Sequence, residues 1–325
     1  MTTQHNCTAF SDSELQTFID VRRQIHAAPE LGGETPHTAE LVAARLEQWG
    51  YHVHVGIGGH GLVGVLKKGQ GSRCIGLRAD MDALPMQEKN PFAHASKIAG
   101  RMHACGHDGH TAILLAAAYR LANSDFNGTL NLIFQPDEEG LCGAKAMIDD
   151  GLFQRFPCDA IFALHNMPGA PVGSVVVQAG PTMASSERVS QTIGGKGGHG
   201  AYPETTVDPV VVGASIVMAL QTIVARNVPP LHTGIITVGA FLAGDAPNVI
   251  PGSAELRLTV RAMQPTVRDL LERRITELAQ AQAASYGATA EVNYIRRYPV
   301  LNNTPEHTDF CKQVVRDWLG DAGLV

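Results

Sequence analysis

The sequence lacks an excess of basic residues, a long apolar run and a leader-like N-terminus. Its 25 Lys and Arg residues are scattered and are outnumbered by 31 Asp and Glu residues, which gives a formal net charge of −6. This balance argues against nucleic acid or an anionic membrane as a partner. No apolar run approaches the roughly 20 residues of a membrane span. The first residues show no basic segment followed by an apolar stretch, so no secretory signal is expected.

The sequence also lacks the cysteine pattern of a disulfide framework. The six cysteines are dispersed, and most lie in expected strands or beside the candidate site: Cys7, Cys74, Cys105, Cys142, Cys158 and Cys311. This distribution is typical of a reduced, cytoplasmic protein. Hydrophobic residues make up 44% of the 325-residue chain and charged residues 17%, as in an ordinary globular protein. A chain of this length is too long for a single hydrophobic core, which indicates two domains.

The first half of the chain alternates between expected helices and short strands with apolar centres. Helices are expected at residues 11–28, 37–49, 109–123 and 143–149, and strands at 51–55, 61–67, 74–78, 129–134 and 160–164. This alternation predicts an α/β sandwich in which helices enclose a mostly parallel sheet. Ligands in such folds gather at the carboxyl ends of the strands.

The pattern changes after about residue 184. Strands are expected at 187–193, 233–241, 254–262 and 290–297, and helices at 208–226 and 265–286. The order β-α-β-β-α-β predicts a ferredoxin-like α+β unit inserted into the first domain. We therefore predict a catalytic domain of residues 1–183 and 297–325, to which a last helix at 305–319 belongs, and an inserted domain of residues 184–296.

Four metal-capable side chains crowd into residues 102–110, directly before an apolar helical run: His103, Cys105, His107 and His110. A thiolate and an imidazole in this position suit Zn²⁺, Mn²⁺ or a similar divalent ion, and the helix N-terminus favours the anionic thiolate. The alternative for Cys105 and His107 is a buried cysteine beside a capping His-Asp pair. The polar residues expected after other strands, Glu139 and His165, favour the metal site over this alternative.

Glu138 and Glu139 follow the expected strand at 129–134. Adjacent carboxylates repel each other, so one is usually balanced by a cation or has a raised pKa. A metal hydrolase needs one carboxylate as a ligand and another as the base that takes a proton from water. The alternative is a solvated acidic turn, which the expected burial of the preceding strand disfavours.

Three further polar residues lie at strand ends. His165 ends the expected strand at 160–164 and is either a ligand or a satisfied polar residue. Asp80 and Asp82 follow the strand at 74–78 and are placed to orient metal ligands, the alternative being a polar turn. Together with the cysteine–histidine segment, these positions predict a metal hydrolase.

A glycine-dense loop at residues 194–200 carries a single histidine, His199. Its glycines allow close backbone approach to a ligand or a partner chain. The loop lacks the spacing of a phosphate-binding loop, so a nucleotide is not expected. A simple hairpin turn is an equally good interpretation of the loop taken alone.

Six segments resemble the M20 metallopeptidase family, in particular its branch of hippurate hydrolases, N-acyl-amino-acid amidohydrolases and auxin-conjugate hydrolases. They occur in the family's order: Arg22–Leu31, Arg78–Pro85, Met102–Thr111, Phe134–Gly140, Gly195–Ala201 and Asn248–Pro251. The resemblance implies a catalytic α/β domain and an inserted lid domain through which two chains form a homodimer.

The resemblance also implies roles for particular residues. Two divalent metals per site (Mn, Zn, Co or Ni) would be held by Cys105, His107, Glu139 and His165. Glu138 would be the general base, with Asp82 beside it in the catalytic group. His199, Asn248 and Arg261 would bind the substrate, with His199 reaching the site of the partner subunit. The implied reaction is hydrolysis of the amide bond of N-acyl amino acids, either hippurate-like or with acetyl or other aryl-acyl groups.

The chain departs from the family near its C-terminus. Family members continue past a helix like that expected at 305–319, with further strands and a last metal-binding histidine, whereas this sequence stops at Val325. His307 lies in a different context and is not assigned to the metals. The sequence therefore predicts a C-terminally truncated form. It leaves open the alternative of an inactive homologue that binds metal or ligand or serves as a dimer partner.

Overall fold

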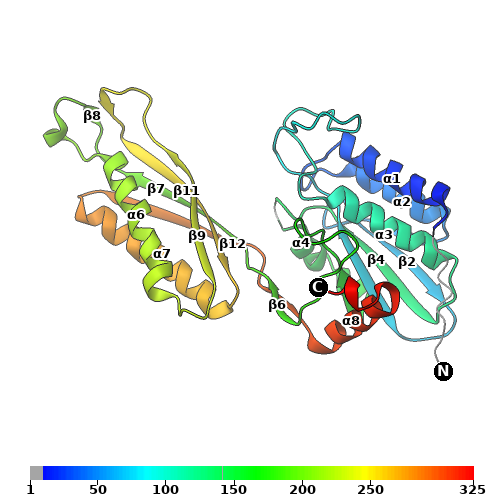
Figure 1. Ribbon diagram of the computed structural model, residues 1–325. Coiled ribbons are helices and arrows are strands. Elements are labelled where there is room, and N and C mark those ends of the chain that lie inside the picture. The colour runs from blue at the N-terminus through cyan, green and yellow to red at the C-terminus, as the bar shows by residue number, and fades with distance from the viewer. Residues whose placement is uncertain (1–9, 141) are drawn as a thin grey trace. The chain divides into compact units, whose positions relative to one another are not determined.

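A computed structural model describes residues 10–140 and 142–325 of the chain (Figure 1). The chain divides into two compact units, residues 1–169 and 170–325. The domain boundaries expected at residues 183/184 and 296/297 stay predictions. The described cysteines are free thiols, while Cys7 lies outside the described residues.

The first unit contains the expected alternation of helices and strands. Its elements are α1 (Asp12–Ala27), α2 (Pro36–Gln48), β1 (His52–Ile57), β2 (Gly61–Lys68), β3 (Cys74–Asp80), α3 (His107–Ala122), β4 (Gly128–Gln135), α4 (Gly143–Asp149), α5 (Leu152–Arg155) and β5 (Ala160–Ala163). Local signals explain several ends. Ser11 caps α1 in a capping box with Glu14, and Gly50, at a φ of 84°, follows α2 in the left-handed conformation.

The sheet of the first unit is mixed, with the strand order β1-β2-β4-β3-β5. Strand β3 pairs in parallel with β4 and β5, whereas β1 with β2 and β2 with β4 are antiparallel. The α/β class is therefore confirmed, but the expected parallel arrangement covers only β4, β3 and β5. The hairpin-like succession of β1 and β2, joined by a short turn, allows the antiparallel pairing.

Helices cover both faces of this sheet, so that its centre is buried. One core cluster joins α1, α2 and α3 to one face, with Leu46, Leu115 and Phe134 fully buried. A smaller cluster joins α4 and α5 to the other face through Met147 and Leu152. Burial on both sides explains the apolar run of β4, and it holds the strand ends in fixed positions.

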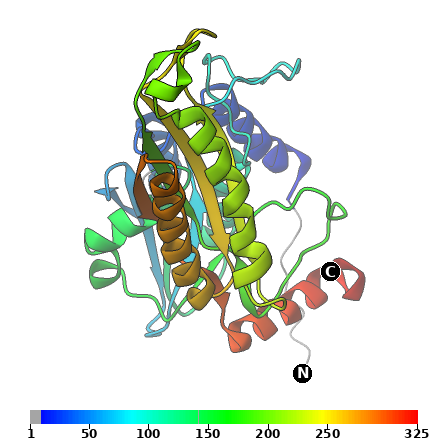
Figure 2. The ribbon, with the colours of Figure 1, turned by 90° about the vertical axis from the view of Figure 1, so that its left-hand side faces the viewer.

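The second unit contains the expected β-α-β-β-α-β order. Its elements are β6 (Gly180–Met183), β7 (Glu187–Gly194), β8 (Gly198–His199), α6 (Pro209–Asn227), β9 (Gly234–Leu242), β10 (Val249–Ile250), β11 (Ser253–Ala262), α7 (Pro265–Ser285), β12 (Thr289–Arg296), β13 (Leu301–Asn303) and α8 (Pro305–Leu319), with short 3₁₀ turns at Pro203–Thr205 and Asp321–Gly323. The antiparallel sheet order β12-β7-β11-β9 is that of a ferredoxin-like unit. Helices α6 and α7 lie on one face of it (Figure 2).

Helix α6 corrects the expectation that no apolar run approaches the length of a membrane span. It spans 19 residues and, among the described residues, is the single helix long and apolar enough to cross a membrane. Its Asp208 side chain accepts a hydrogen bond from Val210 N–H at 2.8 Å, as a capping residue does. One side of the helix, including Ile216 and Leu220, is fully buried against α7 and the sheet. This contact identifies α6 as a core helix of its unit.

Candidate metal and catalytic site

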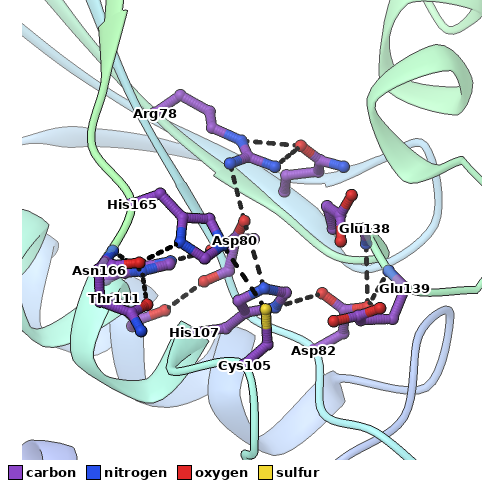
Figure 3. Close-up of polar contacts among 12 residues, drawn as sticks. Arg78, Asp80, Asp82, Cys105, His107, Thr111, Glu138, Glu139, His165 and Asn166 are labelled. Atoms are coloured by element: carbon purple, nitrogen blue, oxygen red, sulfur yellow. Dashed lines mark hydrogen bonds and ion pairs between the residues drawn. The ribbon is translucent and has the colours of Figure 1, made fainter. Parts of the chain in front are cut away.

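The parallel half of the first sheet brings the polar strand ends together. Strand β3 ends at Asp80, β4 is followed by Glu138 and Glu139, and β5 is followed by His165. Because β4, β3 and β5 run in parallel as neighbours, their carboxyl ends meet at one edge of the sheet. Figure 3 shows these side chains around His107, which comes from the start of α3.

Helix α3 begins at His107, two residues earlier than predicted. Gly106 precedes it with a φ of 94°, a left-handed conformation that favours glycine. A Cβ at Gly106 would lie 2.6 Å from Asn166 Oδ1, so the close approach also requires glycine. The turn at Gly106 places Cys105 before the helix and His107 in its first turn, where the N-terminal dipole favours an anionic thiolate.

Three overlapping groups of potential ligands share His107. Cys105, His107 and His165 form one, His107, Glu138 and Glu139 form another, and Asp80, His107 and His110 form the third; within each group the ligand atoms lie within 4.8 Å of one another. The first two groups contain all four residues expected to bind metal. They also place the expected base, Glu138, beside those ligands.

The buried ring of His107 tests whether these residues fit a metal. Its Nδ1 lies 3.1 Å from Asp82 Oδ1, while its buried Nε2 makes no hydrogen bond among the described residues and lies 3.6 Å from Asp80 Oδ2. Leaving a buried nitrogen unpaired is costly unless something else binds it. A buried imidazole nitrogen without a hydrogen bond, beside a thiol and carboxylates, fits a divalent transition metal.

Asp82 connects three of the expected site residues and is fully buried. One carboxylate oxygen contacts His107 Nδ1, and the other accepts hydrogen bonds from the backbone N–H groups of Glu138 at 2.9 Å and Glu139 at 2.8 Å. The carboxylate therefore orients the imidazole and fixes the turn that carries both glutamates. The orientation of metal ligands by Asp82 and its direct part in catalysis both stay predictions.

Asp80 is another carboxylate beside His107, and it also holds neighbouring side chains in place. Its Oδ1 lies 2.7 Å from His110 Nδ1, and its Oδ2 lies 2.7 Å from Arg78 Nη1. Burial would raise the pKa of Asp80, but the hydrogen bond from His110 and the positive charge of Arg78 hold it well below its usual range. Asp80 is therefore a carboxylate at neutral pH.

His110 and His103, the two histidines of the cysteine–histidine segment that are not expected as ligands, have surroundings different from those of His107. His110 contacts Asp80 through Nδ1, and its Nε2 lies 2.6 Å from Asn166 Oδ1. Both of its ring nitrogens are thus engaged. His103 is buried, and neither ring nitrogen has a partner among the described residues; burial lowers its pKa to about 4. Sequence reasoning missed the part of Asn166, although its place beside His165 was a usable signal.

His165 is exposed and presents its Nε2 to Cys105. Its Nδ1 lies 2.7 Å from the backbone oxygen of Asn166 and donates to it, which leaves the lone pair on Nε2. That nitrogen lies 3.5 Å from Cys105 Sγ. A fixed tautomer of this kind is usual for metal-binding histidines.

The surroundings of Glu138 and His107 raise the pKa of both side chains. Burial, and then the negative charge of Glu139, raise the pKa of Glu138. Burial would lower the pKa of His107, but its hydrogen bond to Asp82, the nearby Cys105 and the neighbouring carboxylates raise it to about 11. A metal that binds His107 must therefore displace a proton from it.

The second unit holds the three expected substrate-binding residues in two places. Strand β8 pairs with β10, so that His199 faces Val249, and Gly200 N–H donates to the backbone oxygen of Asn248 at 2.8 Å. Arg261 lies eight residues along β11 from its start at Ser253, about 26 Å at the usual rise of a strand. The structure thus brings His199 and Asn248 together but not Arg261. All three roles stay predictions.

Comparisons with known proteins agree with this geometry. Peptidase family M20/M25/M40 matches residues 76–324. The chain is 46% identical over 304 residues to a hippurate hydrolase of Campylobacter jejuni, covering 94% of this chain and 79% of that protein. It is 41% identical over 314 residues to IAA-amino acid hydrolase ILR1-like 2 of Arabidopsis thaliana, covering 94% and 70%. The YXEP protein of Bacillus subtilis, a dinuclear metal binding peptidase from the M20 family, superposes with a TM-score of 0.75 at 31% identity and covers 93% of this chain and 80% of that one.

Proposed function

Because the chain belongs to the M20 peptidase family and is a metal-dependent amidohydrolase, we propose that it hydrolyses the amide bond between an acyl group and an amino acid. The observation that carries this proposal is the sharing of His107 by two ligand groups, one with Cys105 and His165 and one with Glu138 and Glu139. This arrangement supplies metal ligands and a second carboxylate at the same strand ends.

Four residues would hold the divalent metals in this proposal: Cys105, His107, Glu139 and His165. A thiolate, two imidazoles and a carboxylate form a donor set suited to Zn²⁺, Mn²⁺, Co²⁺ or Ni²⁺. When bound, such ions lower the pKa of water and polarise a carbonyl group. Asp82 holds the His107 ring and the turn that carries both glutamates, so the ligands are oriented before any metal binds.

Glu138 is the residue that moves protons. Its raised pKa brings it closer to neutrality, where a general base is most effective. It takes a proton from the attacking water at its carboxylate oxygen and then passes this proton to the nitrogen of the leaving amine. His199 would donate a hydrogen bond to the oxyanion, while Asn248 and Arg261 would bind the rest of the substrate.

A panel of substrates tests the proposal. The metal-free chain is supplied with Mn²⁺, Zn²⁺, Co²⁺ or Ni²⁺ and assayed on N-acetyl, N-benzoyl and indole-acetyl amino acids. We expect release of the free amino acid from at least one member, and none with a chelator present. Metal binding without turnover of any member would contradict the proposed reaction and favour a protein that only binds metal or ligand.

We also propose a homodimer formed through residues 184–296. Strand β9 is at the edge of its sheet and exposes Ile235 and Leu242, and α6 exposes Val211 and Met218 beside its buried side. An open strand edge with exposed apolar side chains supports pairing with another chain. The resemblance to the family adds that His199 acts at the partner's site.

Mixing two variants tests whether His199 acts at the site of the partner subunit. His199→Ala should lower turnover while the metal stays bound, and Glu138→Gln should do the same. A mixed dimer has one of its two sites with both residues intact. Activity should therefore return to about a half of the wild-type value in purified mixed dimers, and to about a quarter in a random mixture of the two variants. Verified heterodimers without any rescue would place His199 in its own subunit's site or outside catalysis.

A further inference from the structure

Four charged or titratable side chains from distant parts of the first unit meet behind the start of α3. Asp108 Oδ2 lies 2.8 Å from Arg22 Nε and 2.8 Å from His26 Nδ1. His26 Nε2 lies 3.2 Å from Glu88 Oε1. Arg22 and His26 belong to α1, Glu88 to the segment after β3, and Asp108 to α3. We call these four residues the Asp108 cluster.

Three of the four residues of the Asp108 cluster are buried, while the side chain of Arg22 is 39% exposed. His26, Asp108 and Glu88 are all buried, and Glu88 accepts further hydrogen bonds from Asn90 Nδ2 at 2.9 Å and Ser96 N–H at 2.5 Å. The ring of His26 has Phe92, His94 and His103 as ring neighbours. Buried charges need such partners, so loss of any one contact leaves another group uncompensated.

The cluster adjoins the metal-binding segment through the backbone. Asp108 directly follows His107, and Cys105 lies three positions before it. The turn between them depends on Gly106, a residue with a wide range of backbone conformations, and no side chain caps α3. Asp82 holds the His107 ring from one side. His26 holds the next residue of the chain from the other.

We propose that His26 is a positioning residue, which sets the orientation of Cys105 and His107 through its hydrogen bond to Asp108. This inference rests on the metal site of the proposed function. The competing view is that the cluster only packs α1 against α3 and that its contact with Glu88 matters as much as its contact with Asp108. The two ring nitrogens of His26 separate these views, because each faces a different carboxylate.

Two substitutions keep one contact each. The amide nitrogen of Asn lies as many bonds from Cβ as His Nδ1 does, so His26→Asn retains a donor for Asp108 and loses Glu88. The amide nitrogen of Gln corresponds to His Nε2, so His26→Gln retains a donor for Glu88 and loses Asp108. Both replace a buried imidazole with a buried amide, which makes them matched controls for the loss of packing.

Binding of Co²⁺ to the metal-free chain provides the measurement. A thiolate ligand gives a charge-transfer band whose position and intensity report the geometry at Cys105, and titration gives the affinity. We expect His26→Gln to weaken Co²⁺ binding by about 10–100-fold, as changes around metal ligands do, and to alter the band. His26→Asn should bind Co²⁺ with the affinity and spectrum of the unchanged chain. Thermal unfolding of both metal-free variants reports the loss of packing separately.

Each other outcome overturns the inference. Equal loss in both variants would mean general packing, loss in His26→Asn alone would make Glu88 the anchor, and no loss in either would remove any positioning role. A wild-type chain without a thiolate band would instead contradict the proposed metal site. If neither variant folds, Asp108→Asn, which weakens the contacts with both His26 and Arg22, is compared with Arg22→Gln, which removes only the Arg22 contact. A changed band in Asp108→Asn but not in Arg22→Gln supports the inference, and an unchanged band in Asp108→Asn, or the same change in both, overturns it.

Discussion

Replacing Glu138 with Gln is expected to lower the turnover of an N-acyl amino acid by about 10²–10⁴-fold while the chain keeps its metals. The amide has nearly the shape of the carboxylate but cannot take a proton from water. The backbone N–H of residue 138, which donates to Asp82, is unchanged by the substitution. The metal content after gel filtration and the steady-state rate are the two measurements.

The same change at the next residue is the matched control. Glu139→Gln removes one charge from the same turn, whose backbone is held by the same oxygen of Asp82. Because Glu139 is proposed as a ligand, this variant should lose metal as well as turnover, and excess metal should restore part of its activity. Equal metal loss in both variants would contradict the assignment of separate roles to Glu138 and Glu139.

The positions of the site residues along the strands were predictable because burial and chain order are both visible in the sequence. The apolar run of β4 is buried on both faces, and Glu138 and Glu139 come where it ends. The mixed character of the sheet was not predictable in the same way. A strand's apolar pattern reports burial but not the direction of its neighbour, so β1 and β2 were expected in a largely parallel sheet and are antiparallel.

The contacts that shape the site come from tertiary structure. The predicted helix at 109–123 begins at His107 because Asp82 and Asp80 hold the polar first turn, and no periodic apolar pattern marks that turn. The two hydrogen bonds from the glutamate turn to Asp82 involve backbone N–H groups. Such bonds are independent of residue type, and a sequence pattern cannot reveal them.

The short strands and the pairing register of distant strands could also not be predicted from the sequence. Strands β8 and β10 have two residues each, too few for an alternating pattern to appear. Their pairing brings His199 beside Val249, next to Asn248. The expected strand at 254–262 already placed Arg261 near its end, but the pairing of β11 with β9 and its bulge between Arg257 and Leu258 were not visible in the sequence.

Replacing Cys105 with Ser is expected to weaken metal binding by more than the roughly 10–100-fold that changes around metal ligands cost, with a matching loss of activity at limiting metal. The neighbouring His107 lowers the pKa of Cys105, but burial and the charge of Glu139 outweigh this effect, so the thiol is protonated at neutral pH before a metal binds. A metal can still ionise the thiol by displacing its proton. It cannot readily do so with a serine hydroxyl, so the variant lacks an anionic ligand beside His107 and His165.

Metal content measured after equilibration with a buffered free-metal concentration tests this expectation. Cys311→Ser is the control, because it makes the same sulfur-to-oxygen change in α8 at a partly buried cysteine outside the three ligand groups. Loss of metal in Cys105→Ser but not in Cys311→Ser ties the effect to the site and not to thiol chemistry in general. If Cys105→Ser keeps its full metal content and rate, the thiolate is no ligand, and the metals must depend on the group that His107 forms with Glu138 and Glu139.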